Sequence, residues 1–198
     1  MNIDWNTHRF SGGVLALDLV NTVIFRQAPD RSEDRLADPA ALPRFSAAAA
    51  KHRADEWGEV RFTPPASQRA LSELIGLRES LDRLFRSAVR SGGFAPEHLS
   101  DFLGRGAAQV RREPAGGRLV LPQSPGGPRQ LSLSAAAVLS AMRLFEPARA
   151  ERIAICPNCH WLYFDASRNR SRRWCDMRVC GNRAKARRHY GRKGADHG

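Results

Sequence analysis

The sequence lacks the features that would place the chain in a membrane or outside the cell. No uninterrupted apolar run approaches the ~20 residues that a membrane-spanning helix needs. Residues 1–10 are polar and lack the basic segment followed by an apolar one that marks a secretory signal. We therefore expect a cytoplasmic protein with no membrane partner, in which thiols stay reduced and structural disulfides are disfavoured.

Patterns typical of an active site are missing as well. We find no Ser/His/Asp set and no glycine-rich phosphate loop, and the six histidines show no metal-ligand spacing. The sequence therefore does not indicate an enzyme. Only a cleft that held Asp18 with a perturbed pKa would reopen that question.

Cysteine is absent from the first 155 residues and then occurs four times in the last 43. Cys156 and Cys159 have two residues between them, and Cys175 and Cys180 have four. Two close pairs with a short loop between them can present four thiolates tetrahedrally to one zinc ion. We expect one structural Zn²⁺ on these cysteines. Because sulfur fills all four positions, no position is left for a catalytic water.

Two other interpretations of the cysteines fit less well. Cys156-Pro-Asn-Cys159-His160 also matches the haem attachment pattern, but such attachment normally follows export and would leave Cys175 and Cys180 unexplained. A redox dithiol would use one exchanging pair, whereas four cysteines with basic flanks favour a closed zinc site.

Positive charge is concentrated at the carboxyl end. Residues 151–198 hold 12 Lys and Arg against 4 Asp and Glu, whereas residues 1–150 hold 20 against 16. Such an excess attracts phosphates, even after a zinc tetrathiolate has removed about two charges. The expected nucleic-acid contacts come from a basic loop and from a helix after Cys180: Arg168, Arg170, Arg172, Arg173, Arg183, Lys185, Arg187 and Arg188.

The helix after Cys180 is expected to reach about Tyr190, and its length of about 15 Å suits the DNA major groove. Arg183 is our choice for a base contact, although Asn182 and Arg183 are equally suited to holding the compact motif together. The other interpretation of the basic face is a helix and loop that are only solvated.

Hydrophobic periodicity predicts a mainly helical amino-terminal part. Helices are expected at about residues 12–23, 38–49, 67–91 and 134–145; the first of these segments could also be a buried strand. Another helix is expected from Pro96, with an inner face of Leu99, Phe102, Leu103, Ala107 and Val110. Residues 110–121 are expected to form a β-hairpin, and residues 147–152 a short linker.

The expected fold is α+β in two parts. Residues 1–150 would form a mainly helical domain with a β-hairpin, and residues 151–198 a small treble-clef-like zinc finger with a basic tail. So small a fragment cannot bury enough apolar area to fold alone, so metal binding should supply its folding free energy.

Asp18, Asn21 and Thr22 are spaced i, i+3 and i+4, so a helix places them on one face. One interpretation is structural: the three cap a helix or are buried with partners, and an ion pair from Asp18 to an arginine is the simplest form. The other is that they line a small-molecule pocket, which would make the domain an effector sensor.

The finger resembles the CGNR zinc-finger family, whose naming tetrapeptide stands here as Cys180-Gly181-Asn182-Arg183. The match spans residues 155–189 and includes Trp174-Cys175. Residues 16–22 (ALDLVNT) and 36–42 (LADPAAL) resemble the ABATE domain, which usually precedes this finger. The resemblance implies a bacterial, stress-linked transcription regulator.

Together these features predict a transcription regulator that binds duplex DNA, with a homodimer gathering enough phosphate contacts. Two alternatives stay open. A binder of RNA or the ribosome would stack unpaired bases on aromatic side chains of the finger, namely Trp161, Tyr163, Phe164 and Trp174. A structural finger would instead close the larger domain or bind a protein.

Overall fold

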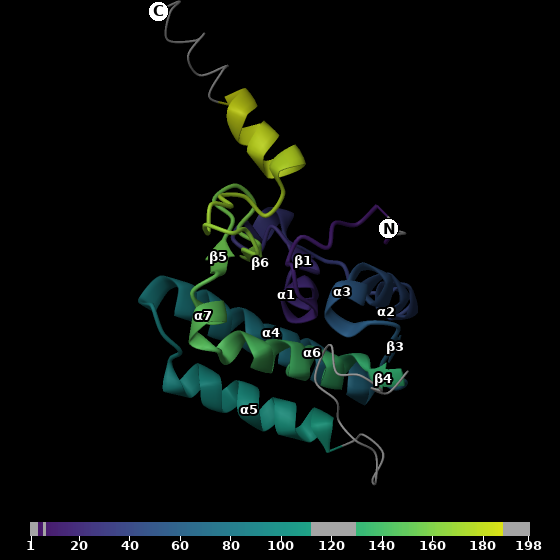
Figure 1. The fold of residues 1–198 in the computed structure, drawn as a ribbon. Coiled ribbons are helices and arrows are strands. Elements are labelled where there is room, and N and C mark those ends of the chain that lie inside the picture. Colours follow the sequence, from purple (N-terminus) through teal and green to yellow (C-terminus); the bar gives the residue numbers. More distant parts are fainter. Residues whose placement is uncertain (1–3, 6, 112–129, 188–198) are drawn as a thin grey trace, which may run out of the picture.

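The structure, a computed structural model, describes residues 4–5, 7–111 and 130–187. Three long helices form its framework, α4 (Gln68–Ser91), α5 (Pro96–Val110) and α6 (Leu133–Met142). They lie side by side in Figure 1, and each packs against the other two. The short helix α1 (Leu15–Val20) packs on α4 and α6 and is buried along its whole length. The amino-terminal part is therefore mainly helical, as predicted.

Two helices follow their sequence patterns closely. α4 begins after Ser67, whose hydroxyl accepts a hydrogen bond from the Ala70 amide, and it ends at Gly92 in the left-handed conformation. α2 spans Ala41–His52 instead of the predicted 38–49, because Ala40 and not Asp38 precedes its first turn, but it buries the expected apolar stripe of Leu42, Phe45 and Ala49.

The inner face of α5 differs from the prediction. Phe102, Gly106 and Gln109 face the core, whereas Leu103 is 51% exposed and Ala107 faces solvent. The reason lies at Gly106, where a Cβ would approach Val138 Cγ1 of α6 to 3.2 Å. Close approach of the two helices at this glycine fixes which face of α5 is buried, so Leu103 and Ala107 were wrongly predicted as core.

α1 is shorter than the predicted helix at residues 12–23, and its start depends on distant residues. The Leu15 amide donates to Glu56 Oε2 at 2.7 Å, and the Ala16 amide donates to Ser140 Oγ at 3.0 Å. Ser140 in turn donates to Glu56 Oε1 at 2.6 Å. Glu56 lies on α3 (Ala54–Trp57), a helix absent from our prediction. These bonds satisfy amides that a helix start leaves without partners.

Short strands join distant parts of the body. β1 (Val23–Ile24) and β2 (Glu33–Asp34) pair antiparallel around the single turn η1 (Pro29–Arg31). β3 (Arg61–Thr63) pairs in parallel with β4 (Gln130–Ser132). None of these strands was predicted, because two or three residues show no periodicity.

The predicted hairpin at residues 110–121 overlaps the end of helix α5. α5 continues through Val110, and Arg111 follows as its cap. The first strand of the predicted hairpin was therefore wrong at residues 110 and 111, which belong to the end of this helix. Residues 112–121 lie outside the described part of the chain. The predicted helix at 134–145 is α6, followed by the 3₁₀ turn η2 (Arg143–Phe145).

The carboxyl-terminal part is a small finger at one end of the helical body (Figure 1). After α7 (Pro147–Ala150), where a linker was predicted, β5 (Ile153–Ile155) and β6 (Leu162–Phe164) form an antiparallel hairpin. The π-turn η3 (Met177–Gly181) leads into a helix over residues 182–187 that points away from the body. The described residues contain no helix long and apolar enough to cross a membrane.

The finger shares its hydrophobic core with the helical body. Ile153 and Leu162 are 5% and 0% exposed and belong to the same buried cluster as α1, α4 and α6. The Phe164 amide donates to the Gly12 carbonyl at 2.7 Å. A Cβ on Gly13, whose φ is +86°, would lie 3.2 Å from Phe164. The hairpin is therefore docked directly on the segment that precedes α1.

Candidate metal centre and nucleic-acid interface

The four cysteines converge on one point. The sulfurs of Cys156, Cys159, Cys175 and Cys180 all lie within 4.8 Å of one another, and none forms a disulfide. The Cys159–Cys175 and Cys175–Cys180 sulfur distances are 3.3 and 3.6 Å. Tetrahedral zinc with bonds of 2.3 Å requires sulfurs about 3.8 Å apart. The predicted ligands therefore fit one zinc ion.

Hydrogen bonds within each turn orient the two cysteines of each pair toward the common point. At the first pair, the His160 amide donates to the Cys156 carbonyl at 2.9 Å, and His160 takes a left-handed φ of 62°. At the second, Asp176 Oδ1 accepts from the amides of Arg178 and Val179. The Cys180 amide donates to the Asp176 carbonyl at 2.9 Å. The hydrogen bonds of these two turns use only backbone and carboxylate partners.

Contacts among the cysteine thiols shift their pKa values. Hydrogen bonds from Cys159 and Cys175 lower the pKa of Cys156, and the same contact with Cys156 raises the pKa of Cys159 to about 12. Contact with Cys156 also raises the pKa of Cys175. One thiolate therefore forms readily while its neighbours resist ionisation. A divalent cation removes that conflict because it stabilises all four thiolates together.

Arg172 does not belong to the basic surface on which we placed it. Its guanidinium turns inward and donates to carbonyl oxygens of Ser11, Phe164, Trp174 and Cys175. Its carbonyl accepts from the Tyr163 hydroxyl at 2.7 Å, and its guanidinium lies over the Tyr163 ring. Arg172 therefore holds the basic loop to the finger and to the body, because its donors are committed to backbone groups.

The rest of the basic loop is exposed and has a defined shape. Buried Asp165 accepts from the amides of Ser167 and Arg172 at 2.8 and 3.0 Å. Arg168 and Arg173 face solvent. Arg170 is exposed too but pairs with Glu151 at 2.6 Å, which reduces its availability to a phosphate.

The helical residues after η3 present the other predicted cations. Arg183, Lys185 and Arg187 are exposed, and Arg187 also donates to the Asn158 side chain beside the first cysteine pair. Arg188 lies outside the described residues. Arg178, on η3, is exposed as well; we did not predict it, although it lies between Cys175 and Cys180.

A groove joins the basic loop to this helix. It has a volume of about 340 Å³ and is lined by Arg173, Trp174, Ala184 and Arg187. Two cations therefore flank one indole, although the residues are up to 14 positions apart in sequence. Only the packing of the loop against the helix brings them together.

The candidate ligand residues on α1 are all buried with protein partners. Asp18 pairs with Arg53 Nε at 2.5 Å and accepts from the Gly12 amide at 2.8 Å. Burial raises the pKa of the Asp18 carboxyl, and Arg53 opposes that rise. Thr22 Oγ1 donates to the Leu19 carbonyl at 2.7 Å. These contacts favour the structural interpretation of Asp18 and Thr22.

Asn21 connects α1 to the finger. Its Nδ2 donates to the Leu162 carbonyl at 2.8 Å, and its Oδ1 accepts from the Leu162 amide at 3.1 Å. The side chain thus satisfies both backbone groups of one residue of β6, as a neighbouring strand would. No feature of the sequence around Asn21 pointed to a partner 141 residues away.

Comparison with known families supports both parts of the chain. A model named CGNR zinc finger matches residues 152–193, which include all four cysteines. The ABATE model, described as "Putative stress-induced transcription regulator", matches residues 13–147, more than half of the chain. Neither description names an enzyme, and a search of curated proteins found no match. The chain belongs to the ABATE family and carries a CGNR zinc finger that can hold one zinc ion.

Proposed function

We propose that the protein is a transcription regulator that binds duplex DNA through its zinc finger. The observation that carries the proposal is a set of exposed cations on the basic loop, on η3 and on the projecting helix. Five of them have no carboxylate partner among the described residues: Arg168, Arg173, Arg178, Arg183 and Lys185. Unpaired exposed cations on a fixed framework are what phosphate binding requires.

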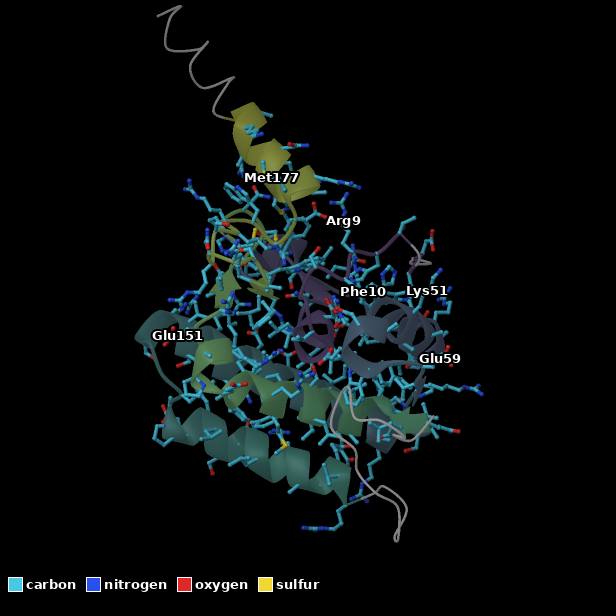
Figure 2. The ribbon with its side chains drawn as sticks, in the orientation of Figure 1. Arg9, Phe10, Lys51, Glu59, Glu151 and Met177 are labelled. Carbon is cyan, nitrogen blue, oxygen red and sulfur yellow. The ribbon has the colours of Figure 1, made fainter. Side chains whose placement is uncertain are left out.

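The projecting helix supports the proposal further. Of residues 182–187, only Ala184 is partly covered, and the helix stands clear of the body (Figure 1). Figure 2 places Met177 at its base, with Arg9 nearby. A helix that is polar on nearly all sides gains little from packing on its own protein. Its exposed Arg183 and Lys185 are available to enter a major groove.

Burial of the finger aromatics favours a duplex over unpaired bases. Tyr163 is 2% exposed and its hydroxyl is bonded, and Phe164 packs on the shared core. Neither ring is available for base stacking. Of the four finger aromatics, Trp161 and Trp174 remain, and both are partly covered. The Arg173–Trp174–Arg187 groove suits a phosphate between two guanidiniums, with the sugar against the indole.

The contacts that hold the finger on the body use other residues. Asn21, Leu162 and Arg172 make the junction, and none lies on the exposed basic face. A purely structural finger would need only that junction.

We also propose that two copies bind together, because a dimer doubles the phosphate contacts.

Selection of bound sequences from random duplex DNA and from random single-stranded RNA, using zinc-loaded protein, tests the proposal. We expect enrichment of one duplex motif, with an inverted repeat if the bound species is a dimer. Capture of RNA without any duplex would support the RNA-binding alternative. Failure to retain either nucleic acid at low salt would leave only a structural or protein-binding finger.

A further inference from the structure

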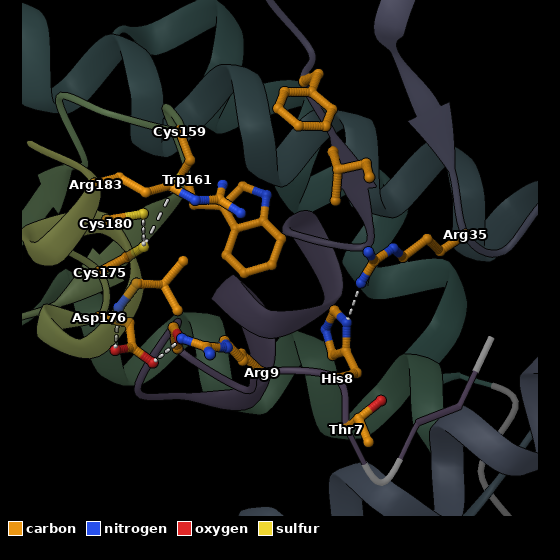
Figure 3. Close-up of a pocket in the computed structure, with 14 residues that line it drawn as sticks. Thr7, His8, Arg9, Arg35, Cys159, Trp161, Cys175, Asp176, Cys180 and Arg183 are labelled. Atoms are coloured by element: carbon orange, nitrogen blue, oxygen red, sulfur yellow. Dashed lines mark hydrogen bonds and ion pairs between the residues drawn. The ribbon is translucent and has the colours of Figure 1, made fainter. Parts of the chain in front are cut away.

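A cavity of about 260 Å³ lies between the helical body and the finger (Figure 3). One wall comes from the segment before α1 and from the β1–β2 region, including His8, Phe25 and Arg35. The other comes from the finger, including Trp161 and Arg183, and three of the zinc ligands line the same cavity: Cys159, Cys175 and Cys180. The cavity is distinct from the Arg173–Trp174–Arg187 groove and shares no residue with it.

His8 lines this cavity and holds the Arg35 guanidinium beside it. It is 6% exposed, and its Nδ1 lies 2.5 Å from Arg35 Nη1. Because a guanidinium only donates, Nδ1 must accept and Nε2 must carry the ring proton. That Nε2 is buried and has no partner in the structure. In Figure 3 it points away from Arg35, toward the side where Arg9 and Trp161 lie.

Arg35 brings a charge that Glu33 influences only from beyond ion-pair distance. Among the described residues no carboxylate lies within ion-pair distance of its guanidinium, and its buried Nε has no partner. Burial lowers the pKa of Arg35, and burial also holds His8 neutral, with a pKa of about 3. A half-buried cation without an ion-pair partner is a costly arrangement unless an anion completes it.

The other residues that line the cavity indicate the shape and polarity of the ligand that it can hold. The His8 and Trp161 rings lie 5.8 Å apart, and Ile24 and Phe25 add apolar surface. At the sulfur end, Arg9 and Arg183 line the cavity beside the cysteines, and Arg9 pairs with Asp176 at 2.9 Å. An anionic group therefore belongs at the His8–Arg35 end and a flat apolar group beside Trp161.

We propose that this cavity binds a small aromatic carboxylate, with its carboxylate on the Arg35 guanidinium, which His8 Nδ1 holds in place, and its ring against Trp161 and Phe25. Such a ligand touches the ABATE part and the finger at once, so its binding stabilises their docked arrangement. The proposal does not depend on nucleic-acid binding.

Calorimetric titration of the full-length, zinc-loaded protein tests the proposal. The probes are benzoate, 2-naphthoate and indole-3-acetate, each compared with its primary amide and with inorganic phosphate. We expect saturable binding of at least one carboxylate and a tenfold or greater loss for its amide, because the amide lacks the charge that Arg35 pairs with. The Trp161 indole N–H resonance should shift on binding.

Two variants locate the site. Arg35→Met and His8→Phe should each weaken binding tenfold or more, whereas Arg61→Met, an exposed arginine on β3, should bind like the wild type. Zinc content and far-ultraviolet circular dichroism show whether each variant is folded. If neither variant folds, the comparison of carboxylate with amide on the wild type decides. Equal binding of the amide, equal binding of phosphate, or no binding by any carboxylate would overturn the proposal.

Discussion

At the scale of single residues, Asn21 shows how one side chain can join two parts of a protein. Its amide group matches both the donor and the acceptor of the Leu162 backbone, which lies in the shared core. No hydroxyl or carboxylate offers both a strong donor and an acceptor at that spacing at neutral pH.

Replacing Asn21 by alanine should therefore destabilise the junction. The change leaves the buried amide and carbonyl of Leu162 without partners, which costs about 2–4 kcal/mol in the free energy of unfolding. Urea unfolding followed by circular dichroism measures this. Asn182→Ala is the matched control, because Asn182 is exposed and its Nδ2 makes one bond, to the Arg178 carbonyl. Equal small effects for both variants would refute the role of Asn21.

His8 gives a pH-dependent prediction. Its pKa falls from 6.5 to about 3 in the folded protein, mainly through burial, so below pH 6.5 the unfolded chain binds a proton that the folded chain does not. Its contribution to stability is complete above pH 6.5 and is lost as pH falls toward 3. Between pH 7.5 and 5.5 the loss is about 1.4 kcal/mol.

Unfolding of wild type and His8→Phe at saturating zinc, at both pH values, measures the contribution of His8. Because both proteins share the same zinc site and carboxylates, those contributions cancel in the difference. The variant should lose about 1.4 kcal/mol less than the wild type between the two pH values. An identical pH dependence in both proteins would show that His8 is not held neutral.

At the scale of elements, the basic loop separates two roles that its sequence does not distinguish. Arg172 and Arg173 are neighbours, yet Arg172 is bonded to four carbonyls and Arg173 is exposed in the groove beside Trp174. The loop can present one arginine outward because the other fixes its path.

Parallel substitutions test this separation. Arg172→Gln should lower the stability of the finger by about 2 kcal/mol or more, since buried carbonyls lose charge-assisted bonds. Arg173→Gln should leave stability within about 0.5 kcal/mol and weaken binding to every duplex alike. Thermal melting and fluorescence anisotropy provide the two readouts. The reverse pattern would place the phosphate contact at Arg172.

The elements also show which parts of the fold could be predicted from sequence. α2 and α4 each carry an apolar stripe, α4 also carries its caps, and the zinc ligands lie in two short turns. The start of α1 could not be predicted because its partners Glu56 and Ser140 come from other helices. The inward turn of Arg172 and the cavity around His8 likewise depend on contacts between segments far apart in sequence.

At the scale of the whole molecule, the finger and the body share one hydrophobic core. Ile153 and Leu162 extend the body core into the hairpin, and the metal site holds the other end of that hairpin. The junction explains why a small zinc module need not rely on its own core, which could not supply enough buried area.

Removal of zinc should therefore affect more than the finger. We expect the melting temperature of the entire chain to fall after chelation and to recover when zinc is restored, because loss of the hairpin uncovers Leu162 and its neighbours in the body. Circular dichroism at a helix-sensitive wavelength follows the body directly. An unchanged helix melting temperature in the chelated protein would show that the two parts fold independently.

The most direct test of the whole proposal is the salt dependence of duplex DNA binding by the zinc-loaded protein. Six exposed cations on the finger are expected to touch phosphates: Arg168, Arg173, Arg178, Arg183, Lys185 and Arg187. If all six do, the logarithm of the binding constant should fall with the logarithm of salt concentration at a slope of about −5.4 for each finger bound. A slope near zero would contradict the claim that this surface binds DNA phosphates.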